Sequence, residues 1–394
     1  MATLLQKSIK PNSPDALLFS DLLNAAQKNN SSTIRTVDVA VVGGGIAGAA
    51  VGYFLALKGI ENVVFDKMDK EHNLNPNLSF QNSSIPSALT KLGVQSGEET
   101  STQVLSPGGK ALLLKQQITA LQSANSPANE FLLQKAQKAG SFCVRQTVLN
   151  LTQERGGWIV KTEKGEIRCR IVIGADGVHS LVRNSVSKPI SDQHLSLGTG
   201  FYVNSDRKMK QSIQFLKERS EVLKITSDKN KLRIGLFGPC ATSRGRKSRL
   251  ETIVKERFGF HKFHSPWTSF LPGATSPSFF DLPCAGKNWL LLGAAAGHVH
   301  PLSAEGAVFA LHSAELASQA LKCGDPRIFD SLWRESFEYQ LKSAAKLKRL
   351  FHTPWISNPL LRTATFSSQA SQLISSLVVP SFRVSQREKY AAIN

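Results

Sequence analysis

The chain has 394 residues, of which 41% are hydrophobic and 20% charged, and its formal net charge is +19. This length and composition exclude a fibrous or disordered chain and predict one large or two ordinary globular domains. The five cysteines are scattered without a C-x-x-C pair, which excludes a disulfide framework and a zinc site of common spacing. A reducing, cytoplasmic location is the expectation that follows.

The positive charge predicts anionic partners without naming them. A phosphorylated nicotinamide cofactor, an acidic small-molecule substrate and an anionic membrane surface all stay open. Nucleic acid is disfavoured, because the sequence contains no recognised binding module and no basic motif interleaved with aromatic residues.

The N-terminal extension, residues 1–35, comes before the periodic part of the chain. Ser13 and Pro14 are a helix start signal, and leucines follow at helical spacing, so we expect one short helix here. The extension has no long apolar stretch of the secretory type, and Asp15 and Asp21 argue against an organelle transit peptide.

Residues 36–67 have the pattern of a strand, a glycine turn, a helix and a second strand. Gly43, Gly45 and Gly48 form G-x-G-x-x-G, and Asp66 ends the second strand. The first glycine permits the turn, the second lets the backbone approach a pyrophosphate, and the third allows close helix packing. The acid accepts hydrogen bonds from a ribose diol. The pattern predicts a dinucleotide site, the alternative being a buried turn without ligand. Five glycines interrupt the uncharged run at this helix, so we expect no membrane span.

The segment that follows contains shorter signals. We expect helices over 84–94 and 128–139, with a mostly polar loop over 97–110 that contains a Pro-Gly-Gly turn. Strands over 158–162 and 166–172 are expected to pair around a Lys-Gly turn.

A second informative stretch, IVIGADGVHSLVR, covers residues 171–183. It has an apolar strand, then a glycine-flanked acid at Asp176 and Gly177, then a helix. Such an acid at a strand end holds a ligand hydroxyl or a nicotinamide edge; the alternative is an ordinary Asp-Gly turn.

Residues 190–285 change character and contain alternating segments such as 232–237 together with basic clusters. We expect a separate sheet that covers the cofactor and shapes a substrate pocket. One basic cluster consists of Arg244, Arg246, Lys247 and Arg249. We expect these residues to lie in a solvated loop, and the alternative is a phosphate site.

A third stretch, residues 288–317, has a strand, a small-residue turn at Gly293 and a loop fixed by Pro301. The helix that starts after this loop would aim its N-terminus back at the loop's ligand, which suits the anionic reduced form of a flavin. His298 and His300 are the weak candidates for acid or base catalysis, and a structural role is the commoner one for such histidines.

The C-terminal region, 326–394, contains apolar residues at helical spacing followed by Lys342, Lys346, Lys348 and Arg349. This pattern favours a core-packing helix with a charged outer face. The alternative is a basic amphipathic element in peripheral contact with a membrane surface.

Together the three stretches resemble the FAD-dependent oxidoreductase/monooxygenase family with the p-hydroxybenzoate hydroxylase fold, over about residues 36 to 350. The third stretch is most similar to the geranylgeranyl reductase-like branch, whose motif reads GDAAG, a Pro, then Gly-Glu-Gly. The resemblance implies an α/β fold with a Rossmann-type (glutathione reductase-like) FAD-binding domain, an inserted mixed or antiparallel sheet that forms the substrate domain, and a C-terminal helical tail. The boundaries we expect are 36–95, 128–190 and 286–325 for the FAD-binding domain, 96–127 and 191–285 for the substrate domain, and 326–394 for the helical region.

The resemblance also assigns residues to the cofactor. The glycines of the first stretch and its acid would bind the ADP half of FAD, the second stretch would lie near the pyrophosphate and the entry of nicotinamide, and the third would line the flavin ring. The residues implied are Gly43, Gly45, Ile46, Ala47, Gly48, Asp66, Lys67, Asp176, Gly177, Gly293, Ala294, Pro301, Glu305, Gly306 and Ala307.

Three positions depart from the family pattern. Ala294 replaces the aspartate of GDAAG, Ala304 replaces the first glycine of Gly-Glu-Gly, and Asn125 stands near the place of a frequent arginine. Each change removes or weakens a contact to FAD, at about 1.5 to 3 kcal/mol for a charged hydrogen bond. The sequence also contains neither the Tyr-x-Trp-x-Phe-Pro motif typical of the reductases nor the Gly-x-Trp-x-Trp-x-Ile-Pro motif typical of halogenases, so halogenation is disfavoured.

The activity implied is that of an oxidoreductase whose reduced flavin hydroxylates or reduces an apolar, aromatic or isoprenoid-like substrate. The sequence contains no second G-x-G-x-x-G, so NAD(P)H would serve as a transient co-substrate. The alternative is a catalytically degenerate flavoprotein that acts as a binding or regulatory module, an idea that the three departures motivate.

Overall fold

The computed structural model describes residues 35–67, 77–80, 87–121, 128–206, 209–228 and 231–380. The helix expected in the N-terminal extension and the position of Asn125 lie outside these ranges.

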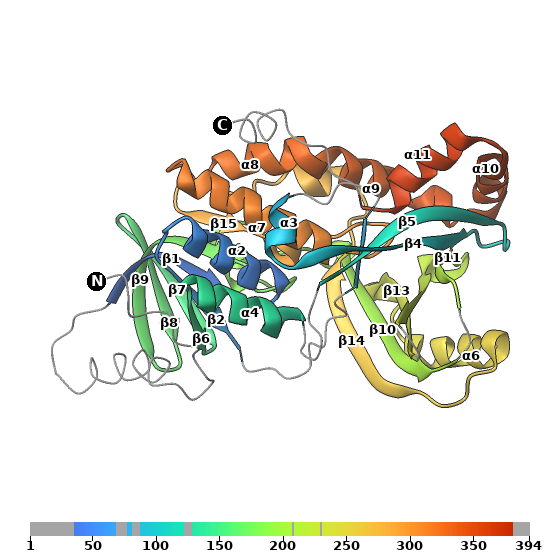
Figure 1. Ribbon diagram of the computed structural model, residues 1–394, viewed down its shortest axis with the longest axis horizontal. Coiled ribbons are helices and arrows are strands. Elements are labelled where there is room, and N and C mark those ends of the chain that lie inside the picture. The colour runs from blue at the N-terminus through green and yellow to red at the C-terminus, as the bar shows by residue number, and fades with distance from the viewer. Residues whose placement is uncertain are drawn as a thin grey trace.

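Within the described residues, seven strands form a first sheet in the order β6-β2-β1-β9-β8-β7, with β15 paired to β9 (Figure 1). The strands are β1 (Arg35–Val42), β2 (Asn62–Asp66), β6 (Phe142–Arg145), β7 (Val148–Glu154), β8 (Gly157–Thr162), β9 (Gly165–Gly174) and β15 (Trp289–Leu291). The central strands β1, β2, β9 and β15 run parallel, and their valines and isoleucines are buried, as parallel strands covered on both faces require. The hairpin expected around the Lys-Gly turn is confirmed by the antiparallel pairing of β8 with β9.

Three helices pack together beside this sheet: α2 (Ile46–Leu57), α4 (Ala128–Ala139) and α7 (Ala307–Lys322). Small residues keep α2 slim, so that it contacts both α4 and α7 (Figure 1). The helix expected over 128–139 is confirmed, and the one expected over 84–94 is shorter, since α3 covers Ser87–Lys91.

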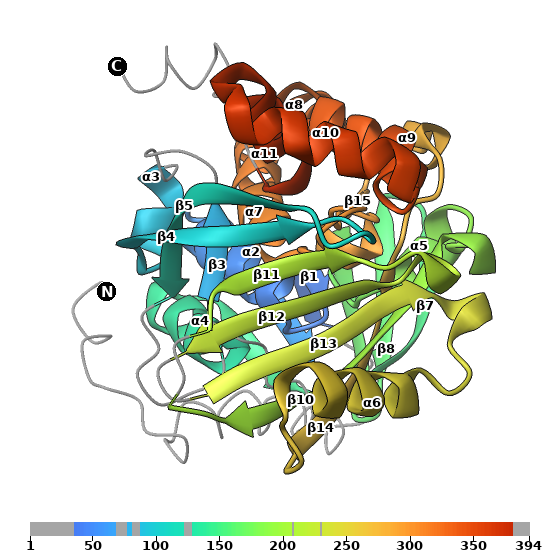
Figure 2. The ribbon, with the colours of Figure 1, turned by 90° about the vertical axis from the view of Figure 1, so that its right-hand side faces the viewer.

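A second sheet of eight described strands has the order β14-β10-β13-β12-β11-β4-β5-β3 (Figure 2). Its strands are β3 (Asn77–Phe80), β4 (Val94–Leu105), β5 (Ala111–Leu121), β10 (Leu195–Asn204), β11 (Gln211–Phe215), β12 (Val222–Asp228), β13 (Lys231–Pro239) and β14 (His264–Pro272). The sheet is mixed, because β4 and β11 are parallel while the other pairs are antiparallel. Helix α6 (Arg246–Phe258) packs on β10 and β13.

The polar loop expected over 97–110 is wrong, because β4 runs to Leu105 and pairs with β5 along its length. Its many Ser, Thr and Gln residues hide a strand that is held by tertiary pairing rather than by local propensity. The expected turn follows it, where the Gly109 amide donates to the Ser106 carbonyl. Strand β3 also pairs in the second sheet, although its residues fall inside the stretch 36–95 that the sequence assigned to the FAD-binding domain.

The C-terminal region is helical as far as it is described. After α8 (Ile328–Trp333) comes a π-helical segment (Arg334–Glu338), then α9 (Tyr339–Phe351), α10 (Pro354–Phe366) and α11 (Ser368–Val378). The inner faces of α10 and α11 bury Leu361, Ile374 and Val378 in one core with Val104 and Leu112 of the second sheet (Figure 2). In the described part of the chain, every helix is too short or too polar to cross a membrane.

Candidate functional site

The glycine turn after β1 has a backbone that only glycine fits at its first position. Gly43 has a φ of +103°, and a Cβ there would lie 2.5 Å from the Ala175 carbonyl oxygen. Gly48 in α2 faces the turn so closely that a Cβ would overlap the Gly43 carbonyl oxygen. Gly45, by contrast, has an ordinary φ of −68° and no neighbour within 4 Å of the position of a Cβ. Its missing side chain therefore leaves open space at the start of the helix.

That open space lies where α2 begins, with Gly45 at its N-cap and no side chain capping it. The first N–H groups of a helix have no partner inside the helix, and the helix dipole favours negative charge there. Ile46 and Ala47 contribute two of these N–H groups. The arrangement fits a pyrophosphate group.

Asp66 ends β2 beside this turn. A Cβ on Gly44 would lie 2.5 Å from the Asp66 side chain, so the carboxylate packs directly against the glycines. Lys67 follows and is exposed. The acid thus stands at the carboxyl end of the strand next to β1, which is the place where a ribose diol is bound in dinucleotide folds.

The second stretch lies against the first. Strand β9 is parallel to β1, and the Ala175 amide donates to the Val42 carbonyl at 2.8 Å. The Asp176 carboxylate caps the helix α5 (Leu181–Val186): it accepts hydrogen bonds from the Ser180 hydroxyl and from the Leu181 amide. Burial raises the pKa of Asp176, while these hydrogen bonds oppose the rise. The Asp-Gly turn therefore has a structural function, at a place adjoining the glycine turn.

Arg183 connects the second stretch to the third. Its guanidinium is 2% exposed and donates to the carbonyls of Ala295 and Lys188, at 2.9 Å each. Burial lowers its pKa, and in the described part of the chain no carboxylate forms an ion pair with it. The sequence indicated the importance of the motif that contains Arg183, but it did not predict the contact of Arg183 with the Ala295 carbonyl.

The third stretch also meets the first. Strand β15 is parallel to β9, and Gly293 follows it with a φ of +56°. A Cβ on Gly293 would lie 3.2 Å from the Ala47 side chain and 3.3 Å from the Ala310 side chain, so α2 and α7 both approach this turn. Ala294 is partly exposed and presents a methyl group where the related motif has an aspartate.

The loop before α7 carries a second departure from the motif. Ala304 has a φ of +55°, in the left-handed region that favours glycine. Pro301 is buried in this loop, Gly306 is the N-cap of α7 and Ala307 its first residue. The alanine thus has a backbone conformation that a glycine, as in Gly-Glu-Gly, adopts without strain.

His298 and His300 are fully buried, and burial lowers the pKa of each to about 3. Both imidazoles are therefore neutral at neutral pH. The His298 ring packs 4.5 Å from the Trp333 ring, with its Nε2 3.7 Å from the Cys284 Sγ. Nδ1 of His300 accepts the Ser303 amide at 3.2 Å. These contacts favour a structural role for the two histidines.

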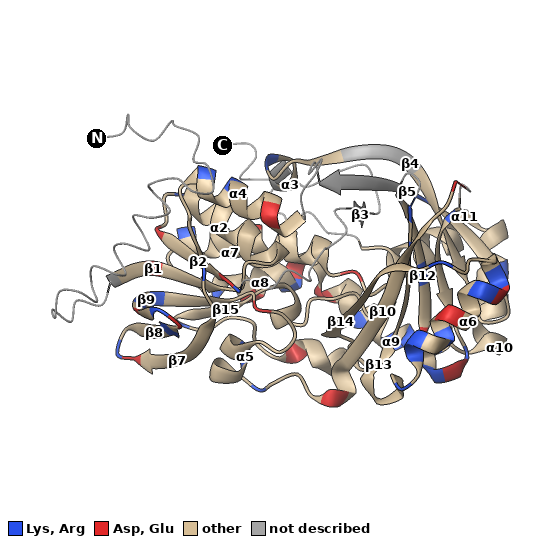
Figure 3. Cartoon of the chain, turned by 90° about the horizontal axis from the view of Figure 1, so that it is seen from below, with Lys and Arg blue, Asp and Glu red and all other residues tan. Residues whose placement is uncertain are grey.

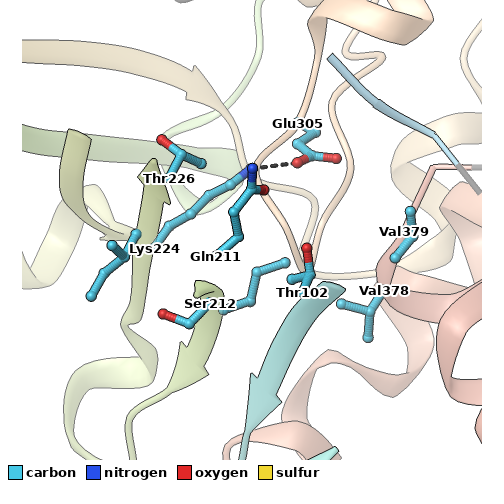
Figure 4. A pocket seen from close by; sticks show the side chains of 10 residues that line it. Thr102, Gln211, Ser212, Lys224, Thr226, Glu305, Val378 and Val379 are labelled. Carbon is cyan, nitrogen blue, oxygen red and sulfur yellow. Dashed lines mark hydrogen bonds and ion pairs between the residues drawn. The ribbon is translucent and has the colours of Figure 1, made fainter. Parts of the chain in front are cut away.

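Glu305 reaches from this loop to the second sheet. Its carboxylate forms an ion pair of 2.5 Å with the Lys224 ammonium on β12, and both side chains are more than four-fifths buried (Figure 4). A small pocket surrounds the pair, with room for about one water molecule. Its lining comes from β4, β11, β12 and the end of α11, and includes Thr102, Gln211, Ser212, Thr226, Val378 and Val379. The sequence did not predict that Lys224 belongs to this site, because the pattern of a strand does not show which loop a lysine side chain contacts.

The basic cluster near residue 246 is not a solvated loop, so that expectation is wrong. Arg246 begins α6, is 1% exposed and donates to the buried Glu221 carboxylate at 2.8 Å. Arg249 pairs with the same carboxylate. Figure 3 shows charged residues of both signs along α6, of which Lys247, Lys255, Glu256 and Arg257 are exposed.

The structure brings the three stretches together at one edge of the first sheet. A comparison with known families supports a cofactor site there. A family model described as "FAD binding domain" matches residues 36–257, more than half of the chain. The chain belongs to this family. It has the p-hydroxybenzoate hydroxylase fold expected from the sequence, and the family is one of FAD-dependent oxidoreductases.

Individual proteins are more distant. A geranylgeranyl bacteriochlorophyll reductase-like protein from Thermoplasma acidophilum superimposes with a TM-score of 0.72 at 17% identity, covering 88% of this chain and 97% of that one. An uncharacterized protein of Methanocaldococcus jannaschii is 25% identical over 210 residues, 48% of this chain and 51% of that protein. The menaquinone reductase of Mycolicibacterium smegmatis is 30% identical over 102 residues, 24% of this chain and 25% of the reductase. The matches thus span about half or less of these two relatives.

Proposed function

We propose that this FAD binding domain protein uses reduced flavin to reduce or hydroxylate an apolar, aromatic or isoprenoid-like substrate, with NAD(P)H as electron donor. The observation that carries the proposal is the convergence of three turns, after β1, β9 and β15, at the carboxyl ends of three parallel strands of one sheet. Ligands of open α/β sheets bind at such an edge.

The residues present fit FAD. The open space at Gly45 and the free N–H groups of α2 would hold the pyrophosphate, and Asp66 the ribose. Gly293, Ala294, Pro301, Glu305 and the α7 residues Gly306 and Ala307 would lie along the flavin. When bound, FAD supplies two-electron redox chemistry, and the chain contributes orientation and exclusion of water.

The substrate side is the second sheet, where the pocket around Lys224 and Glu305 lies. This pocket has room for about one water molecule, far less than the roughly 300–1,000 Å³ typical of ligand pockets. A larger substrate therefore has to displace the ion pair or the end of α11, where Val378 and Val379 present apolar surface. One similar protein is named geranylgeranyl bacteriochlorophyll reductase-like and another menaquinone reductase, and these names support reduction of an isoprenoid-like substrate.

The direct test is a visible absorption spectrum of the purified chain, before and after addition of FAD and NADPH without oxygen. We expect flavin absorption that bleaches with NADPH. Gly45→Ala is the matched variant, because it fills the open space without straining the backbone, and it is expected to lose FAD while its thermal unfolding stays unchanged. A chain that binds no flavin even with excess FAD contradicts the proposal.

A second candidate is the catalytically degenerate flavoprotein, which the methyl group of Ala294 and the small pocket favour. The same experiment separates the two functions. Bound flavin that dithionite reduces, but that neither NADPH nor NADH reduces, would favour a binding or regulatory module.

A further inference from the structure

The outer face of α10 and α11 carries large apolar side chains in contact with solvent. Trp355 is 78% exposed, Phe366 84% and Leu373 59%. Two of these residues, Trp355 and Phe366, are the most exposed of the large hydrophobic side chains in the described part of the chain. The opposite faces of the same helices are already buried against the second sheet, through Leu361 and Ile374.

The exposed residues of α10 form one stripe. Trp355, Pro359, Arg362 and Phe366 are all exposed and are separated by four, three and four residues. Eleven residues at about 100° each return within about 20° of the starting direction, so the tryptophan and the phenylalanine project from the same side. The stripe therefore has an aromatic ring at each end and a cation between them.

The charged residues of the helices at this end of the chain are all basic. Residues 339–380, which span α9, α10 and α11, contain five Lys or Arg and no Asp or Glu. The leucines beside the basic residues of α9 do not form the apolar surface that the sequence analysis considered, because Leu347 packs against the core of the second sheet. The apolar surface lies instead on the two helices that follow.

We propose that the outer face of α10 and α11 docks on an anionic lipid bilayer. Trp and Phe on a helix that lies in the membrane interface bury their rings at the level of the headgroups, and Lys and Arg are attracted to anionic lipids. Lys346 and Arg349 on α9 and Arg362 on α10 are exposed, whereas Lys348 is largely buried and Lys342 pairs with Asp281 and Glu338. Three exposed cations, on helices that carry no carboxylate, complement such lipids. Both helices lie at the end of the molecule that is remote from β1 and α2, on the outside of the second sheet (Figures 1 and 2).

Helix α11 also connects this face to the pocket. Leu373 is on its exposed side, and Val378 and Val379 at its end line the pocket beside Glu305. A lipid-soluble molecule in the bilayer thus has a short path to the pocket. Docking itself does not depend on whether the chain is an enzyme.

The test is co-sedimentation of the full chain with phosphatidylcholine vesicles that contain phosphatidylserine, compared with phosphatidylcholine alone. We expect binding to the anionic vesicles that weakens at high salt. The double variant Trp355→Ser with Phe366→Ser is expected to bind about tenfold or more weakly, because two rings no longer enter the interface. Leu149→Ser is the matched control: Leu149 is 52% exposed on β7 of the first sheet, and its loss is expected to leave binding unchanged.

A second measurement follows Trp355 itself. Brominated lipid is expected to quench the fluorescence of the bound wild-type chain, and this quenching is expected to disappear in Trp355→Phe. Thermal unfolding of each variant shows that it is folded. The proposal is overturned if neither vesicle binds, or if the double variant binds as well as the wild type. It is also overturned if the face is covered by a second copy, shown by a dimer in sedimentation velocity that the double variant dissociates.

Discussion

Two turns of the candidate flavin site are built in different ways. The turn after β1 is shaped by its own backbone: Gly43 has a left-handed φ, and Gly48 lets a helix touch the turn. The loop before α7 also leads into a helix, but Ala304 stands at the position of its first motif glycine and has a positive φ as well. Its shape is kept by contacts with other parts of the fold.

Those contacts come from three directions. Arg183 from the second stretch holds the Ala295 carbonyl, His298 packs on Trp333 from the C-terminal region, and Glu305 pairs with Lys224 from the second sheet. The comparison teaches that a local turn can be recognised from its glycine spacing. A turn that is held by tertiary contacts tolerates the replacement of a glycine. Without that glycine, the turn is harder to recognise from the sequence.

The largest expected effect is at the locally built turn. Gly48→Ala introduces a methyl group that overlaps the Gly43 carbonyl, so we expect the free energy of unfolding to fall by about 3 kcal/mol and FAD binding to be lost. Urea denaturation and flavin titration measure the two effects. Gly52→Ala is not a suitable control, since its Cβ would meet Val64; Gly59→Ala, in open space but with a φ of +71°, shows the cost of backbone strain alone. Equal losses in both variants would show that the close approach is unimportant.

A somewhat smaller effect is expected where the second turn is supported from outside. Arg183→Met leaves the carbonyls of Ala295 and Lys188 without their donors in a buried place, which costs about 2 kcal/mol of unfolding free energy. Arg170→Met is the control, because Arg170 forms an exposed ion pair with Asp38 that contributes little. If the two variants unfold at the same urea concentration, Arg183 does not support the turn.

The histidines of the second turn predict a dependence on pH. Folded His298 and His300 have a pKa of about 3, below that of an unfolded histidine at about 6.5. Between these values the unfolded chain binds more protons, so the stability falls as the pH decreases, by up to about 1.4 kcal/mol per pH unit for each histidine. Urea denaturation from pH 7 to pH 5 measures the slope. His298→Phe, whose ring fits beside Trp333, is expected to reduce it, and an unchanged slope would exclude His298 as a contributor.

The smallest effect tests the missing glycine itself. Ala304→Gly relieves a left-handed alanine, so we expect the free energy of unfolding to rise by about 0.5–1 kcal/mol. Ala56→Gly, in the ordinary helical backbone of α2, is expected to lower it by about 1 kcal/mol. Thermal denaturation of both proteins checks the opposite signs. A loss of stability in Ala304→Gly would mean that the loop is not strained at this residue.

The sequence predicted the family, the fold and the glycine turn, because these depend on short-range patterns: strand, turn and helix signals within about 30 residues. It did not predict β4 as a strand, since only pairing with β5 and β11 makes its polar residues a strand. It also missed the Arg246–Glu221 and Lys224–Glu305 pairs, whose members are 25 and 81 residues apart. The FAD contacts stay predictions, to be tested by the variants at Gly45 and Gly48.

The parallel pairing of β4 with β11 has a consequence for how this chain can be made. The two strands are separated by β6 to β9 of the first sheet and by β10, so the second sheet cannot be completed until the chain has crossed between the sheets and returned. Bringing such distant strands together costs chain entropy before their pairing contributes any stability, and this slows folding. Neither sheet is a continuous segment that can be excised and expressed by itself, and a nascent chain released before β11 would expose an unpaired edge of β4.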